Sequence, residues 1–147
     1  MSTAILTPMR FLISVSVMVF FSIAAPAQTI SPEQKTATQA VIKDQLSAFQ
    51  TGDHDRAFSH AAPSIKKMFR STENFIRMVE SGYNALYASD GYFFARNRTD
   101  GTTIFQEVIA TDQSGKQWQA IYSLQLQDNG SWKITGVQMN PYTGSYT

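Results

Sequence analysis

Both histidines of the chain lie in one short stretch, TGDHDRAFSHAAPSIKKMF, at residues 51–69. His54 stands between Asp53 and Asp55, and His60 follows six residues later. Imidazoles and carboxylates can hold a zinc ion or exchange protons, but only when they converge on one point. Six residues of helix correspond to a rotation of about 240°, so the two imidazoles would point apart. We therefore predict no metal and no cofactor here, and interpret Asp53 as a helix N-cap.

Proton transfer in an apolar pocket is the remaining chemistry, because the chain has no Cys, no G-x-S-x-G elbow and no glycine-rich phosphate loop. Glu107 is the weak candidate for the base, since it is the only acid in the middle of an expected strand. The alternation of residues does not decide which face of the strand carries Glu107. Apolar residues occur on both faces, because Phe105 and Ile109 lie on the same face as Glu107 while Val108 and Ala110 lie on the other. A carboxylate on the solvent face is the competing interpretation.

Residues 1–27 have the pattern of an export signal. One positive charge precedes an apolar run at residues 11–25, which ends in the small-x-small sequence APA at 25–27. The run is shorter than the ~20 residues that a bilayer span needs, and no Cys is present to carry a lipid. We predict cleavage after Ala27, no membrane anchor thereafter, and a periplasmic or secreted protein that begins at Gln28.

The charges balance after this cleavage. The chain has 12 Lys and Arg against 11 Asp and Glu, and Arg10 is the only charged residue of the expected signal, which leaves 11 of each sign. Nucleic acids and anionic membranes are held mainly by excess Lys and Arg, so we expect neither as a partner. The remaining residues, 28–147, are enough for one domain, which must be stabilised by packing alone because no disulfide is possible.

Helical spacing dominates the first half of this domain. The sequence SPEQ at residues 31–34 predicts a capping box with proline at the first helical position, and Gly52 predicts the end of that helix. A second short helix follows Asp53 and ends at Pro63, a further turn begins at Ser64, and Ser71 or Thr72 caps a longer helix.

Strands dominate the second half. β-branched and aromatic residues between turn signals predict strands at 85–95, 103–111, 117–127 and 132–139, with a hairpin turn at Asn129-Gly130. In the last strand, Trp132 and Ile134 share one parity while Val137 and Met139 share the other. This predicts a bulge near Thr135 and Gly136.

The run AFSHAAPSIKKMFRSTENFIRMVESGYNALY (57–87), followed by WQAIYSLQLQDNGSWKITGV (118–137), resembles a bacterial family known as domain of unknown function 4864. That family is placed in the superfamily of nuclear transport factor two and ketosteroid isomerase. The resemblance implies an α+β fold in which N-terminal helices pack on a curved four-stranded antiparallel sheet, shaped as a cone with an apolar cavity. It carries over no catalytic residues.

A set of mostly aromatic side chains from the apolar stripes would line such a cavity. We expect the pocket to contain Phe58, Phe75, Met78, Tyr83, Tyr87, Trp118, Tyr122 and Gln138. Aromatic residues at these spacings also fill ordinary cores, and this alternative stays open.

Three functions are compatible with these observations. The first is a non-enzymatic module that binds a small apolar molecule or a peptide, and we favour it. The second is an isomerase or lyase of the ketosteroid isomerase type, which needs an inward acid near a tyrosine hydroxyl. The third is a homodimer formed through the outer sheet face, although a Gln-rich third strand with Ile121 as its one large apolar residue argues against a tight dimer.

Overall fold

A computed structural model describes residues 28–144 of the chain. The expected export signal at residues 1–27, with its cleavage site after Ala27, lies outside this part. Helices precede strands, as expected, in the order α1 (Pro32–Thr51), α2 (His54–Ser59), α3 (Pro63–Phe69), α4 (Thr72–Gly82), α5 (Asn84–Tyr87), β1 (Gly91–Thr99), β2 (Thr103–Thr111), β3 (Gln117–Leu126) and β4 (Trp132–Pro141). None of the described helices is both long and apolar enough to cross a bilayer.

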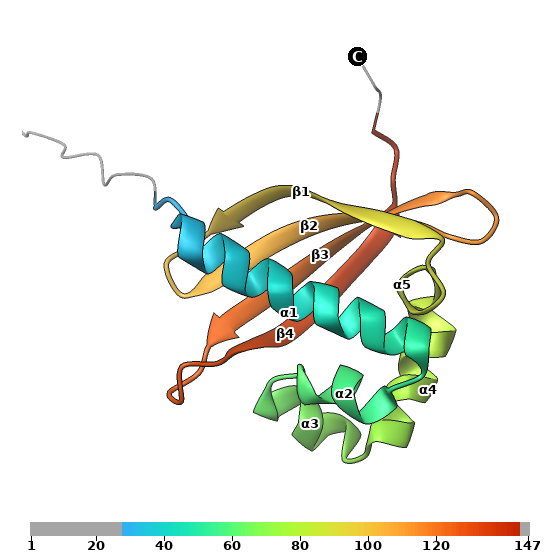
Figure 1. Ribbon diagram of the computed structural model, residues 1–147, viewed down its shortest axis with the longest axis horizontal. Helices are drawn as coiled ribbons and strands as arrows, with labels where there is room; N and C mark the ends of the chain where they lie inside the picture. Colours follow the sequence, from blue (N-terminus) through green and yellow to red (C-terminus); the bar gives the residue numbers. More distant parts are fainter. Residues whose placement is uncertain (1–27, 145–147) are drawn as a thin grey trace, which may run out of the picture.

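The four strands form one antiparallel sheet in the order β1-β2-β3-β4. Figure 1 shows the sheet curving over α1, with α2, α3 and α4 grouped on the side where β4 lies. This arrangement confirms the predicted α+β fold of helices on a curved four-stranded sheet.

The helix ends follow local sequence signals. Ser31 and Gln34 form the capping box of α1, and Gly52 ends that helix with φ 70°, a left-handed conformation that costs glycine little. Asp53 then accepts a hydrogen bond from the Arg56 N–H and caps α2. Ser71, one of the two expected caps, accepts from the Asn74 N–H and begins α4.

The core lies between α1 and the even-numbered positions of β2 and β3. Val108 faces Ala120 across the strand pair, and both are fully buried with Tyr122. Ile42 and Leu46 of α1 pack into the same cluster. On β2 and β3 the helix-facing side is therefore mostly apolar, with the buried Gln106 bonded to Gln39 of α1, and the opposite side carries the odd-numbered residues.

The predicted bulge in β4 is confirmed. Ser123 of β3 pairs with Gly136 and Leu124 pairs with Ile134, which leaves Thr135 as the extra residue. β4 is an edge strand, and Ile134 uses its free backbone groups to bind the connection between α2 and α3. Its N–H donates to the carbonyl of His60, and its carbonyl accepts from the N–H of Ala62.

The strand expected at 85–95 begins later than predicted. Asn84–Tyr87 is one turn of helix, α5, and β1 starts at Gly91 and continues through Asn97 to Thr99. Ala85 and Leu86 are apolar because both are buried, and so short an apolar run fits a helical turn as well as a strand. β1 also ends later than residue 95, because Asn97 pairs with Gln106 after a bulge in the strand.

Asp112 organises the turn between β2 and β3. Its carboxylate accepts hydrogen bonds from the Ser114 hydroxyl and N–H, the Lys116 N–H and the Trp118 indole N–H. Hydrogen bonds from Ser114 and then Trp118 lower the pKa of Asp112 to about 2. A carboxyl group whose pKa falls on folding stabilises the folded state at pH values above its unfolded pKa.

We expect Asp112→Asn to lower the free energy of unfolding at pH 7. The difference from wild type should shrink as the pH falls from about 4 toward about 2, because the wild-type carboxylate is protonated over that range. Urea unfolding at a series of pH values measures this. Asp128→Asn, which changes the same charge in the next hairpin, is the control. A pH-independent difference for Asp112→Asn would contradict the assignment.

Candidate functional site

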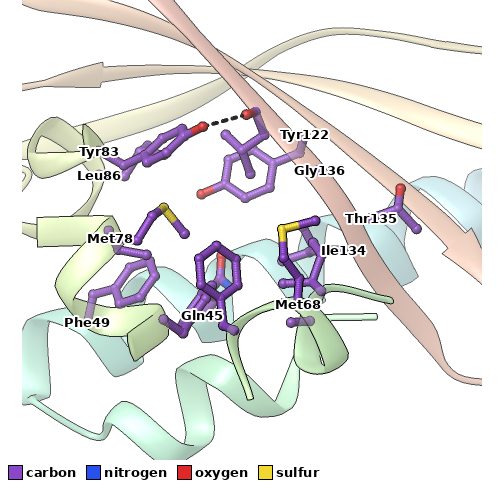
Figure 2. Close-up of a pocket in the computed structure, with 16 residues that line it drawn as sticks. Gln45, Phe49, Met68, Met78, Tyr83, Leu86, Tyr122, Ile134, Thr135 and Gly136 are labelled. Atoms are coloured by element: carbon purple, nitrogen blue, oxygen red, sulfur yellow. Dashed lines mark hydrogen bonds between the residues drawn. The ribbon is translucent and has the colours of Figure 1, made fainter. Parts of the chain in front are cut away.

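An apolar cavity of about 420 Å³ lies between the sheet and the helices. This volume is in the range of ordinary small-molecule sites, about 300–1,000 Å³. The wall is built from α1, α3, α4, the following Tyr83 and α5, and from β3 and β4 (Figure 2). Residues 134–137 of β4 all contribute to it, because the bulge at Thr135 changes the direction of the strand within the wall.

Four of the expected pocket residues line this cavity: Phe75, Met78, Tyr83 and Tyr122. They come from α4, from the residue that follows it and from the inner face of β3. The spacing of apolar residues in the sequence, which suggested these four residues, therefore does place them around one cavity.

The other four lie elsewhere. Phe58 stacks on Phe75 with ring centroids 4.9 Å apart, behind the wall. The Tyr87 hydroxyl lies 3.0 Å from Nε2 of His54, and Trp118 donates to Asp112 at the end of the sheet. Gln138 pairs with the outward-facing Ile121, because the bulge shifts the parity of β4.

Sequence reasoning missed part of the wall. Gln45 and Phe49 of α1 and Ile65, Met68 and Phe69 of α3 also line the cavity. Gln45 was recognisable as a polar residue in the apolar stripe of α1. It is buried, and its side-chain amide donates to the carbonyl of Ala57. α3 gave a weaker signal, because seven residues are too few for a clear periodicity.

Two tyrosine hydroxyls at the cavity differ in their partners. Tyr83 donates to the carbonyl of Val137 at 3.1 Å. The Tyr122 hydroxyl is fully buried and has no hydrogen-bond partner among residues 28–144. Figure 2 shows it pointing from the sheet into the space bounded by Met78 and Gln45. Burial raises the pKa of Tyr122, so the phenol stays protonated and is available as a donor.

The described wall contains no Asp, Glu, His, Lys or Arg. Its polar groups are the two tyrosine hydroxyls, the Gln45 amide, the Thr135 hydroxyl and backbone. Thr135 already donates to the carbonyl of Ser123. The cavity therefore offers an apolar, uncharged surface, and the unpaired hydroxyl of Tyr122 lies just beneath that surface.

Glu107, the weak candidate for a catalytic base, lies on the opposite face of the sheet from the cavity. It is nearly buried, and its carboxylate accepts from the N–H and guanidinium of Arg96 and from the Gln119 amide. Burial opposes its ionisation, but these hydrogen bonds outweigh burial and hold the pKa of Glu107 below its ordinary value. A second hollow of about 380 Å³ surrounds this ion pair on the outer face.

The two histidines do not converge. His54 lies against Tyr87, whereas Nε2 of His60 is 2.6 Å from the carboxylate of Asp44. Within residues 28–144, no group of three or more His, Cys, Asp and Glu side chains is arranged to hold a metal ion.

A matched pair of substitutions separates the two hydroxyls. Tyr122→Phe should leave the free energy of unfolding of the ligand-free protein unchanged or raise it by about 1 kcal/mol, because it removes a buried polar group without a partner. Tyr83→Phe should lower it by about 1 kcal/mol, because it breaks the bond to Val137. Urea unfolding measures both. A loss for Tyr122→Phe as large as for Tyr83→Phe would show that the Tyr122 hydroxyl is already paired.

The chain is similar to known proteins in sequence and in fold. Residues 31–147 match the family described as a domain of unknown function, DUF4864. Two NTF2-like proteins of unknown function have similar solved structures, one from Silicibacter pomeroyi at 17% identity and one from Shewanella baltica at 12%. In each case the TM-score is 0.51, and the match covers 78% of this chain and 100% of the other.

These identities are low enough that the likeness carries the fold alone. No curated protein matches the chain. The match to DUF4864 spans most of the sequence, and the two solved structures have a similar fold. The chain therefore belongs to the DUF4864 family and has the NTF2-like fold.

Proposed function

We propose that the domain binds a small, neutral, mostly apolar molecule in the cavity and does not transform it. The buried Tyr122 hydroxyl carries this proposal, because it faces the cavity without a partner among the described residues. A buried hydroxyl that makes no hydrogen bond costs free energy. A ligand with a carbonyl, hydroxyl or amine group would supply that bond while its apolar body covers the wall.

The absence of charge in the described wall favours a neutral ligand. A carboxylate or ammonium group placed in the cavity would lose its hydration and meet no opposite charge.

A small molecule fits the wall better than a peptide does. A peptide brings one backbone donor and one acceptor for nearly every residue, and each needs a partner when buried. The Tyr83 and Thr135 hydroxyls already donate to the backbone, which leaves few polar groups to receive a peptide.

The isomerase or lyase alternative has less support. It requires an acid near a tyrosine hydroxyl, but Glu107 lies across the sheet from the cavity and is held by Arg96 and Gln119. The homodimer alternative stays a prediction.

We also propose that the domain acts outside the cytoplasm, after cleavage of the export signal. Expression of the full chain in a bacterium should yield a periplasmic or secreted protein whose N-terminal residue is Gln28. Intact mass and N-terminal sequencing of the fractionated cells measure this. A cytoplasmic chain that retains residues 1–27 would contradict it.

The neutral fluorescent probe N-phenyl-1-naphthylamine tests binding directly. It is mostly apolar, so we expect its emission to rise when it enters the cavity, and its one N–H can donate a hydrogen bond to the Tyr122 oxygen. Tyr122→Phe should weaken the binding of the probe about fivefold, which is the effect expected from the loss of one hydrogen bond. Val79→Phe should weaken it about tenfold or more, because Val79 lines the cavity and the added ring takes up space.

Glu107→Gln is the matched control and should leave the probe affinity unchanged, since Glu107 lies outside the cavity. Near-ultraviolet circular dichroism checks that each variant stays folded. Equal affinity of wild type and Val79→Phe would place the probe elsewhere and overturn the proposal. So would a failure of wild type to bind this probe and other neutral apolar compounds.

A further inference from the structure

Four cationic side chains gather where α3 meets β4. Lys66 and Lys67 lie on α3, Arg70 follows its last residue, and Lys133 lies near the start of β4. None of the four forms an ion pair with the described residues. The Lys133 ammonium donates to the carbonyl of Ser59. α3 contacts β4, and burial and then the charge of Lys66 lower the pKa of Lys133.

The carboxylates nearest to these four residues along the chain, Asp55, Glu73 and Asp128, form no ion pair with them. Asp55 accepts a 2.6 Å hydrogen bond from the Thr72 hydroxyl, and Glu73 pairs with Arg77 at 2.7 Å. The cationic group is therefore a local excess of positive charge on a chain whose expected mature form is formally neutral. Net charge alone could not reveal it.

An exposed apolar side chain lies within this group. Met68 of α3 is 70% exposed, more than Leu126 at 55% or Phe93 at 48%, the other large apolar side chains exposed in the described part. Of these three, Met68 alone lines the cavity. None of the residues of α3 is fully buried, and Lys67 and Met68 are exposed together with Arg70, which follows the helix.

We propose that this surface, formed by Lys66, Lys67, Met68, Arg70 and Lys133, docks reversibly on a bilayer rich in anionic phospholipid. Unpaired Lys and Arg side chains are attracted to the negative surface potential of such a bilayer. The flexible thioether of Met68, exposed on the same short helix, can enter the boundary between headgroups and acyl chains. The attraction is electrostatic and the apolar contact is small, so the docking is weak and sensitive to salt.

The position of Met68 gives the docking surface a consequence for the cavity. Because Met68 belongs both to the surface and to the cavity wall, a docked protein holds its cavity next to the membrane. An apolar ligand could then pass between bilayer and cavity without crossing water. This consequence rests on the proposed function, whereas the docking itself does not.

Co-sedimentation with sucrose-loaded vesicles tests the docking. The purified exported protein should sediment with vesicles of equal parts phosphatidylglycerol and phosphatidylcholine, and not with phosphatidylcholine alone. High salt should release it. The double variant Lys66→Gln, Lys67→Gln should bind about 25-fold more weakly, since each cation near an anionic surface contributes about a fivefold effect. Met68→Ser should weaken binding severalfold while every charge remains.

The double variant Lys35→Gln, Lys43→Gln is the matched control, because it removes the same charge from exposed positions of α1. It should bind the anionic vesicles within about twofold of wild type. Equal losses in the two double variants would reduce the effect to net charge and overturn the proposal. So would equal binding to both kinds of vesicle, or release by millimolar inorganic phosphate at constant ionic strength.

Probe binding without vesicles distinguishes failure of this inference from failure of the proposed function. If N-phenyl-1-naphthylamine binds but the vesicles do not, the docking surface is wrong and the cavity proposal stands. If the vesicles bind and the probe does not, the docking stands and the transfer of an apolar ligand is wrong.

Discussion

Two backbone hydrogen bonds on Ile134 join the helical half of the domain to the sheet. Its N–H donates to the carbonyl of His60 and its carbonyl accepts from the N–H of Ala62, both at 2.8 Å. β4 is an edge strand, so these groups have no partner within the sheet. The bonds fix the start of α3 beside β4. From there α3 extends along the cavity with Ile65 and Phe69 only half-buried against the core, which leaves apolar space beneath it.

This arrangement separates the apolar space from the charged groups. Glu107 is satisfied by Arg96 and Gln119 on the outer face of the sheet, and His60 is satisfied by Asp44 on the helical side. The residue types most able to do chemistry therefore pair with each other away from the cavity. The apolar side chains of the wall lack dispersion contacts on the side that faces the cavity. A ligand bound there would supply those contacts and stabilise the folded state.

Features with strong local sequence signals were predicted correctly. Features that depend on contacts between distant parts of the chain were not. The cap at Ser31 and the bulge at Thr135 followed from turn chemistry and parity, and both are present. The turn Asn84–Tyr87 was assigned to a strand, because four residues show no period. The face of Glu107 was undecidable, since β2 is buried on both sides. The position of Met68 depends on how α3 meets β4, and no local pattern encodes that contact.

The most direct test of the central claim is NMR of protein labelled with ¹³C at the ζ carbon of tyrosine, recorded with and without N-phenyl-1-naphthylamine. The account predicts that the Tyr122 signal shifts as the probe saturates, because its hydroxyl gains a partner. Tyr92, on β1 and outside the cavity wall, should keep its position. An unchanged Tyr122 signal at saturating probe would contradict the claim that this hydroxyl recognises the ligand.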